Sequence, residues 1–196
     1  MAPMRAGFLA LCVLLGGCGP PTQTSGSYSF EGSLQGWTPG AVDVLRTAAP
    51  LDWSIVATSE RSFEGAWSAR IFLDNRSDAG KVWLARTYRL VPLRAYDVHV
   101  EFALGTADAG PIGAFRVLAG AAPSLPANGD EAIALARDDT ENGGANEVSW
   151  RIKSYDSVAT ASPSGELTAV VGIWGTFEAE RTYYLDSVAI EFTERP

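Results

Sequence analysis

The sequence predicts an all-β domain built as a two-sheet antiparallel β-sandwich with jelly-roll order. From Tyr28 onward, short runs of alternating apolar residues are separated by Gly, Pro, Asn, Asp and Ser, which is typical of a sandwich or barrel. No stretch keeps a helical period over three turns. About eleven such runs fit into one domain, and that number favours two packed sheets.

The strands are expected near 27–31, 41–47, 53–58, 66–74, 81–90, 96–104, 112–119, 131–137, 146–155, 166–177 and 181–192. The clearest is YDVHVEFAL, where the apolar residues from Tyr96 to Leu104 face one way and the polar residues between them face the other. The segment PIGAFRVLAGAAP comes closest to a helix, but its Gly residues and flanking Pro favour a strand.

The chain begins like an exported lipoprotein. Arg5 precedes an apolar run over 6–15, which is shorter than the roughly 20 residues of a transmembrane helix but suits a signal peptide. The run ends in LGGC, which resembles the bacterial lipobox. The resemblance implies a signal peptide over 1–17, a membrane anchor of diacylglyceryl and palmitate-like chains on Cys18, and a flexible tether over 18–27. The alternative is a plain signal peptide with an incidental cysteine.

Cysteine usage and the residue after Cys18 bear on folding and destination. Cys12 lies within the expected signal peptide, so the mature chain would contain no disulfide. Gly19 stands where an Asp commonly retains lipoproteins at the inner membrane. The resemblance therefore implies export and lipid anchoring to the bacterial envelope at the outer membrane, or on the outer face of a cell with one membrane.

The remaining residues, 28–196, are expected to form one domain with its own core. The net charge of −8 argues against nucleic acid, which requires a basic surface, and against anionic lipid head groups beyond the acyl anchor. An acidic balance is compatible with a bound cation and with neutral partners. It is equally explained by solubility alone.

Three segments together resemble the carbohydrate-binding-module type of jelly roll, within the wider galactose-binding-like fold. They are YSFEGSLQGW near the start, SFEGAWSARIFLD, and RTYYLDSVAIEF near the end. The resemblance spans the whole expected domain, although each motif alone is weak. It implies that the first and last strands lie side by side.

The same resemblance implies a structural Ca²⁺ held by Glu31 and Asp186, with Glu64 and the carbonyls of loop 59–65 as further ligands. Asp186 also shares its strand parity with Val188 and Ile190, so the pattern points a carboxylate toward the core. Such a group needs a partner, and a cation would supply one while joining the two ends of the chain. The alternatives are hydrogen bonds from backbone N–H groups, pairing with an arginine, or a bulge that breaks the parity.

A ligand face is predicted from the polar and aromatic side chains expected on the outward parity of several strands. Sugars stack on aromatic rings, and neighbouring polar groups bind their hydroxyls. If these strands share one sheet, the face would bind carbohydrate. The alternative is that the tryptophans close the core. The predicted ligand-binding residues are Trp83, His99, Glu101, Arg151, Tyr155 and Trp174.

No catalytic motif is present, and the protein is not expected to be an enzyme. His99 is the single histidine, and no GxSxG nucleophile motif accompanies it. A polysaccharide lyase, or a glycosidase with Glu101 and Glu147 as its two carboxylates, is the less favoured hypothesis. The sequence thus favours a Ca²⁺-stabilised module that binds carbohydrate. The alternative is a non-catalytic structural or protein-interaction subunit of the envelope.

Overall fold

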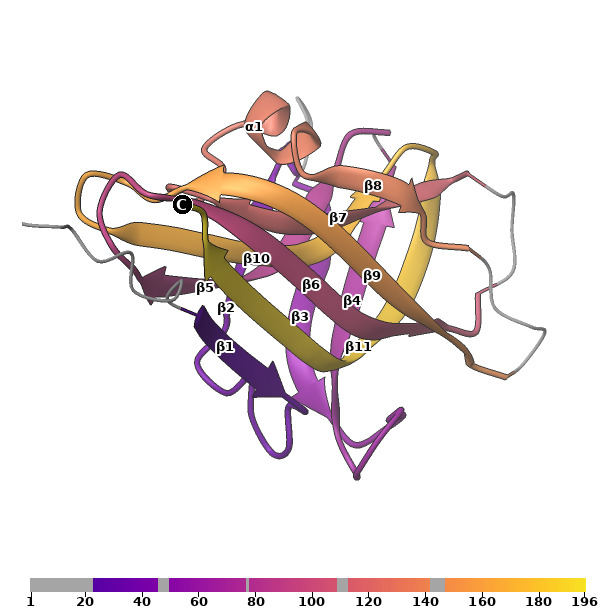
Figure 1. Ribbon diagram of the computed structural model, residues 1–196. Coiled ribbons are helices and arrows are strands. Elements are labelled where there is room, and N and C mark those ends of the chain that lie inside the picture. Colours follow the sequence, from indigo (N-terminus) through magenta and orange to yellow (C-terminus); the bar gives the residue numbers. More distant parts are fainter. Residues whose placement is uncertain (1–22, 46–49, 77, 109–112, 142–146) are drawn as a thin grey trace, which may run out of the picture.

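Two antiparallel sheets pack face to face in a computed structural model that describes residues 23–45, 50–76, 78–108, 113–141 and 147–196 (Figure 1). The predicted all-β sandwich is confirmed. The expected signal peptide and Cys18 lie outside the described residues. Within those residues, no helix has the length and apolar character needed to cross a membrane.

The first sheet has the order β3 (Trp53–Thr58), β4 (Ser68–Asn75), β11 (Ala179–Glu194), β6 (Ala95–Thr106) and β9 (Ser149–Thr160), with β1 (Gln23–Tyr28) also paired to β11. The second sheet has the order β2 (Thr38–Val42), β5 (Lys81–Arg89), β10 (Glu166–Gly175), β7 (Phe115–Ala122) and β8 (Ala136–Asp139). One short helix, α1 (Gly129–Ile133), connects β7 to β8.

The last strand organises the first sheet. Residues 179–185 of β11 pair with β4, and residues 188–193 pair with β1 on the same side. Its other side pairs with β6 over 184–194. The first and last strands therefore lie side by side, as the resemblance implied.

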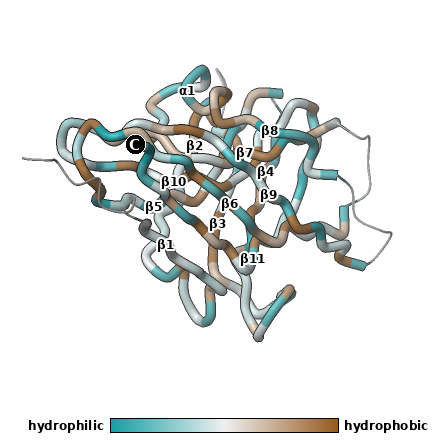
Figure 2. Tube along the Cα trace, in the orientation of Figure 1, coloured by the Kyte–Doolittle hydropathy of each residue, from teal (hydrophilic) through white to brown (hydrophobic). Residues whose placement is uncertain are grey.

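The core fills the space between the two sheets. Tyr96, Val98 and Val100 of β6 and Val82 and Leu84 of β5 belong to one buried apolar cluster. Hydrophobic segments recur along the strands of both sheets, while hydrophilic residues gather toward the loops and strand ends (Figure 2). Each large apolar side chain buried in this way contributes roughly 1.5–3 kcal/mol.

Several boundaries differ from the prediction; for example, the strand expected over 41–47 is β2, over Thr38–Val42. Strand β1 begins at Gln23, so residues 23–27 of the expected tether form a strand instead. The expected strand over 131–137 is α1 followed by β8. Asn128 caps the helix by accepting a hydrogen bond from the Glu131 N–H at 3.0 Å, and its Nδ2 donates to Glu131 Oε1 at 2.9 Å. This reciprocal capping nucleates a helix that apolar alternation alone does not indicate.

Candidate functional site

The structure does not bring the predicted ligand-binding residues onto one face. Strands β6 and β9 belong to the first sheet, whereas β5 and β10 belong to the second. The expectation of a shared face is therefore wrong, because it required these strands to lie in one sheet. The residues occupy three surfaces: His99 and Glu101 on the outer face of the first sheet, Arg151 and Tyr155 on its inner face, and Trp83 and Trp174 on the outer face of the second.

The two tryptophans lie under α1 instead of facing solvent. Trp83 is only 2% exposed and packs with Leu118 and Leu135 in a small second cluster. Trp174 is half-buried at the margin of that cluster, with Lys81 Nζ 5.3 Å from its ring centroid. The helix that the sequence did not predict covers this face, so Trp83 is not available to stack a sugar.

Arg151 and Tyr155 lie on the core side of β9, at the edge where the two sheets meet. Tyr155 is opposite Val100 in the ladder and Arg151 is opposite Leu104, and both partners face the core. The Tyr155 hydroxyl donates to Asp138 of β8. Arg151 Nε donates to Glu141 Oε2 at 3.0 Å. These residues therefore join the two sheets.

We call the polar contacts between the two sheets the seam; it consists of Asp138, Glu141, Arg151, Lys153 and Tyr155. Lys153 lies at its centre and is only 5% exposed. Its Nζ donates to Asp138 Oδ2 at 3.2 Å, to Glu141 Oε1 at 3.1 Å and to the Asp139 carbonyl at 2.8 Å. Burial acts to raise the pKa of Asp138, but the hydrogen bonds from Tyr155 and Lys153 outweigh it and lower that pKa. Hydrogen bonds from Lys153 and Arg151 lower the pKa of Glu141. The seam is a stabilising charge network.

His99 and Glu101 do lie on an open surface, the outer face of the first sheet. His99 is aligned with Glu191 of β11 and Asp156 of β9, and its Nδ1 lies 2.8 Å from Asp156 Oδ1. Two adjacent hollows of about 400 and 340 Å³ meet here, and His99 and Glu191 line both of them. We call this shallow feature the acidic groove; its polar lining side chains are Ser25, Ser27, Asp97, His99, Asp156, Glu191 and Thr193.

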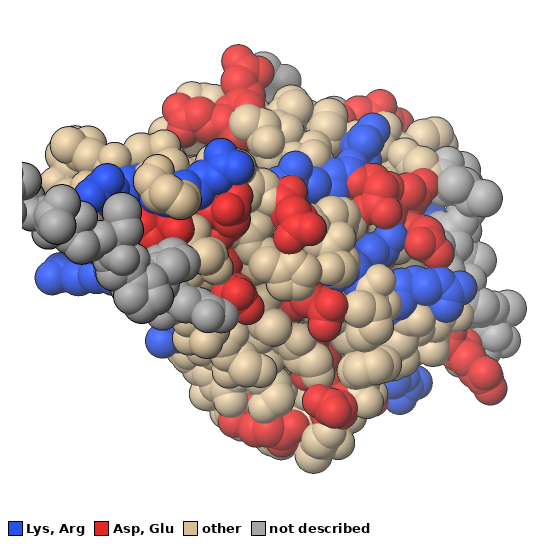
Figure 3. All heavy atoms as spheres, in the orientation of Figure 1, with Lys and Arg blue, Asp and Glu red and all other residues tan. Residues whose placement is uncertain are grey.

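Figure 3 views the molecule from this side and shows acidic residues spread over the face, with basic residues among them. Burial of Tyr155 in the seam, together with its hydrogen bond to Asp138, raises the pKa of Tyr155. That side chain is therefore a neutral hydrogen-bond donor, held away from the groove. The sequence missed Asp156 and Glu191, which enter the groove only through the register of β9 and β11 against β6.

An aromatic patch lies on the same outer face, beyond Glu101. Trp150 of β9, Gly105 of β6 and Tyr184 of β11 are aligned in adjacent strands. The Trp150 ring centroid lies 6.5 Å from that of Tyr184 and 5.7 Å from that of Phe63. Phe63 is 44% exposed. We call Phe63, Trp150 and Tyr184 the aromatic patch.

The prediction placed Arg151 and Tyr155 on the outward face of this strand, so Trp150 on the opposite face was not among the expected ligand-binding residues. The parity within β9 was right, but the choice of outward face was reversed. Gly105 was the available signal: a Cβ there would lie 2.7 Å from the Trp150 ring, so Trp150 covers a strand position that has no side chain. A glycine within a strand often marks such a close approach.

The carboxylates predicted to bind calcium do converge between β1, β11 and the loop before β4. Asp186 is fully buried and lies where the pairing of β11 shifts register, between Asp186 and Ala189. Leu185 before this bulge and Val188 after it both face the core. The bulge changes the parity, so Asp186 is aligned with Ala103 on the outer side of the sheet and does not point into the core.

Backbone amides surround these carboxylates. Asp186 Oδ2 accepts from the N–H groups of Phe63 at 2.8 Å and Glu64 at 3.0 Å, and Oδ1 accepts from Ser187 N–H at 2.7 Å. Glu31 Oε1 accepts from the N–H groups of Ala66 at 2.9 Å and Trp67 at 3.2 Å. The amide alternative foreseen for Asp186 is confirmed.

The charged side chains of this cluster are all acidic. Burial raises the pKa of Asp186, and the nearby negative charge of Glu31 adds to the effect. Glu64 Oε2 accepts from the Ser187 hydroxyl at 3.1 Å. In the described part of the chain, no ion pair involves these carboxylates, and no group of three or more His, Cys, Asp or Glu residues is arranged to hold a metal. The predicted calcium site would therefore depend on the Glu31 and Asp186 carboxylates together with backbone carbonyls of the neighbouring loop.

The sequence matches no protein-family model and no curated protein. Similar solved structures include the CBM22-1 xylan-binding domain of Xyn10C from Paenibacillus barcinonensis, at 16% identity over 87% of this chain and 94% of that one, with a TM-score of 0.48. They also include TmCBM61 in complex with β-1,4-galactotriose, at 15% identity over 83% and 92% and a TM-score of 0.47. A third is the K1 cleaved adhesin domain of Lys-gingipain from Porphyromonas gingivalis W83, at 13% identity over 85% and 97% and a TM-score of 0.47. The carbohydrate-binding modules that the sequence resembles are therefore among the structures to which this β-sandwich is similar, and the likeness concerns the fold.

Proposed function

We propose that this protein is a non-catalytic envelope lipoprotein that binds a neutral carbohydrate on the outer face of its first sheet. The observation that carries the proposal is the aromatic patch lying on the same open face as the acidic groove. Aromatic rings stack against the C–H faces of sugars, and carboxylates and hydroxyls accept or donate hydrogen bonds at sugar hydroxyl groups. The carboxylates of the groove would repel uronates, so neutral glycans are favoured.

A glycan array on the chain from Gly19, which retains every described strand, tests the proposal. Trp150→Ala and Phe63→Ala should each weaken binding to the best neutral glycan at least about tenfold, or 1.4 kcal/mol. Phe177→Ala is the matched control, since Phe177 is similarly exposed, at 49%, in the turn between β10 and β11. A folded protein that binds no glycan, or that binds equally after all three changes, would contradict the proposal.

The aromatic patch also supports a second candidate, a protein-interaction subunit of the envelope. Ile152 beside the patch is 54% exposed, so a protein partner could cover an apolar area there. Crosslinking from a photoreactive residue at position 152 distinguishes the two. A discrete protein adduct that neutral glycans do not displace would favour the protein partner over the glycan.

A structural calcium ion is proposed for the Glu31–Asp186 cluster. The support is the convergence of two carboxylates, one fully buried, with no cationic side chain paired to them among the described residues. Calcium at millimolar concentration should raise Tm relative to EDTA, and Glu31→Gln should abolish that difference. Asp156→Asn, on the exposed groove, should preserve it. Equal Tm values in calcium and EDTA for the unaltered protein would dismiss the ion.

The lipid anchor on Cys18 and the outer-membrane location are proposed from the lipobox-like segment alone. In a bacterial expression host, an alkyne analogue of palmitate should label the unaltered chain and not Cys18→Ser. Cell fractionation should place the labelled protein with the outer membrane. Labelling of the Cys18→Ser protein, or the absence of labelling of the unaltered protein, would count against the lipid anchor.

A further inference from the structure

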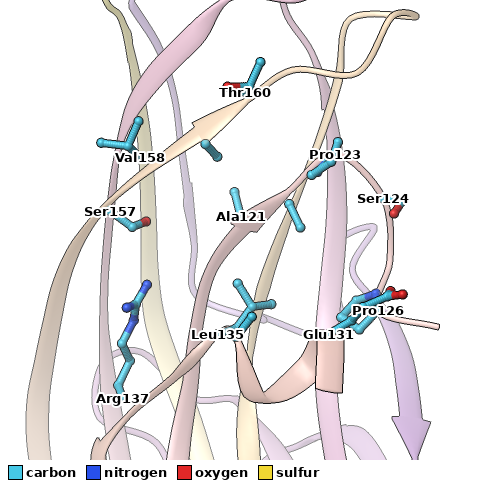
Figure 4. Close-up of a pocket in the computed structure, with 13 residues that line it drawn as sticks. Ala121, Pro123, Ser124, Pro126, Glu131, Leu135, Arg137, Ser157, Val158 and Thr160 are labelled. Atoms are coloured by element: carbon cyan, nitrogen blue, oxygen red, sulfur yellow. The ribbon is translucent and has the colours of Figure 1, made fainter. Parts of the chain in front are cut away.

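A cavity of about 550 Å³ opens at the edge of the sandwich, away from the aromatic patch (Figure 4). It lies between the end of β7, α1, β8 and β9. Its walls are largely apolar, formed by Ala121, Pro123, Pro126, Leu135 and Ala159. Its volume falls in the usual range for small-molecule sites, about 300–1,000 Å³.

One end of the cavity is polar. Arg137 reaches up from β8 toward Ser157 of β9, with Leu135 beside them (Figure 4). Gly120 leaves this end open: a Cβ there would lie 3.1 Å from Arg137 Nη2, 3.2 Å from Leu135 Cδ2 and 3.7 Å from Ser157 Oγ. A guanidinium and a hydroxyl therefore converge on one point of the cavity.

The Arg137 side chain is held in place by other groups. Its Nε donates to the Ala119 carbonyl at 2.8 Å, and its guanidinium lies 5.9 Å from the centroid of the Tyr155 ring. These contacts orient the fork and leave its Nη atoms toward the cavity. A preorganised guanidinium loses less side-chain entropy when it binds an anion.

The charge of Arg137 is not matched by an acid within the described residues, since none of their ion pairs includes it. Glu131 also lines the cavity, but on the opposite side from Arg137 (Figure 4). Its two oxygens accept from Ala127 N–H and Asn128 Nδ2, both at 2.9 Å, at the start of α1. The polar end of the cavity is thus positive.

We propose that this cavity binds a small aliphatic carboxylate. The carboxylate would accept hydrogen bonds from Arg137 and Ser157, and the alkyl chain would lie along the proline, alanine and leucine walls. No aromatic side chain is among the described residues that line the cavity, so it does not suit the stacking of a sugar ring. The inference is independent of carbohydrate binding on the outer face.

The test is a titration of the ¹⁵N-labelled chain from Gly19 with sodium octanoate and, separately, with octanol. Octanoate should bind at least about tenfold more tightly than octanol, and its shift changes should map to residues 120–122, 135–137 and 157–159. Arg137→Gln should bring octanoate down to the affinity of octanol and leave octanol unchanged. Arg89→Gln, an exposed arginine on β5 outside the cavity, should leave both affinities unchanged.

A second variant covers the case in which Arg137→Gln fails to fold. Ala134→Phe, at the exposed rim of the cavity, should fill it and abolish the binding of both probes while Tm is retained. The proposal would be overturned by equal affinities of the unaltered protein for octanoate and octanol, or by shift changes confined to the outer face. It would also be overturned by an octanoate affinity that Arg137→Gln leaves unchanged, or by octanoate binding that survives Ala134→Phe.

Discussion

At Asp186 the alternation of inward and outward side chains along a strand is broken, so the face predicted from that alternation is wrong. The sequence aligns it with core positions, yet Ser187 adopts a positive φ of 50° and the ladder shifts there. The carboxylate then points to the outer side and accepts three backbone N–H groups. Two of those donors, Phe63 and Glu64, belong to the loop that contributes Phe63 to the aromatic patch. Asp186 is therefore a positioning residue for Phe63.

Asp186→Ala should destabilise the fold by about 2–4 kcal/mol, because it leaves three partly buried backbone N–H groups without their acceptor. Asp186→Asn keeps one acceptor oxygen, and about half that loss is expected. Urea denaturation gives the free energy of unfolding. Asp156→Ala is the matched control, since the Asp156 side chain is 88% exposed. A loss for Asp186→Ala no larger than for this control would refute the structural role.

The seam around Lys153 predicts a pH dependence. The pKa values of Asp138 and Glu141 are lowered from 3.8 and 4.5, so both carboxyls bind protons less readily in the folded state. Their stabilisation is present above those ordinary values and is lost as the pH falls through the lowered ones. Lys153→Met should reduce stability by about 1–2 kcal/mol at pH 7, since both carboxylates are about half exposed.

The same variant should flatten the dependence of unfolding free energy on pH below pH 4.5. Arg116→Met is the control, because among the described residues the Arg116 guanidinium donates to the Arg137 carbonyl and to no carboxylate. If the unfolding free energies of Lys153→Met and the unaltered protein fell in parallel with pH, the seam would not be the cause of the loss of stability at low pH.

At the scale of elements, alternation predicted most strands because it follows from burying one face of each. It failed for α1, where a capping interaction between Asn128 and Glu131 starts a helix five residues long. It also failed for Asp186 in the middle of β11, where a bulge changes the parity. Both failures depend on local backbone conformation, which hydropathy alternation does not encode.

The bulge at Ser187 can be tested by changing its backbone freedom. Ser187→Gly should leave stability nearly unchanged, because glycine favours a positive φ while the hydrogen bond to Glu64 is lost. Ser187→Val should cost about 1–3 kcal/mol, since a β-branched residue strains this conformation. Thermal denaturation of the two variants gives the comparison. A valine variant as stable as the glycine variant would mean that the positive φ is not required.

At the scale of the whole molecule, the two-sheet architecture could be predicted, but the face that binds a ligand could not. The sequence gives the parity within a strand and does not say which sheet receives it. Trp83 and His99 have equivalent outward patterns, yet one lies beneath α1 and the other on an open sheet. Assignment to sheets depends on pairings between strands distant in sequence, such as β11 with β1, β4 and β6.

The same long-range pairing makes the N-terminal strand part of the fold, and this corrects the expected tether. Tyr28 packs edge-on against Trp37 with ring centroids 5.4 Å apart, and its hydroxyl lies 3.0 Å from that of Tyr88. Arg86 lies 4.7 Å from the Tyr28 ring centroid. Strand β1 also covers residues 188–193 of β11, which would otherwise be an open edge.

Truncation therefore locates the true start of the domain. A chain beginning at Gly19 should match the longer protein in Tm, whereas one beginning at Ser29 should lose at least about 3 kcal/mol, since it gives up a partly buried aromatic ring and a strand ladder. The shorter chain should also aggregate through the exposed edge of β11, detectable by light scattering. Tyr28→Ala in the chain from Gly19 separates the ring from the ladder and should cost about 2 kcal/mol without aggregation. If the chain from Ser29 were as stable and as monomeric as the chain from Gly19, residues 23–27 would be a tether, as the sequence alone had indicated.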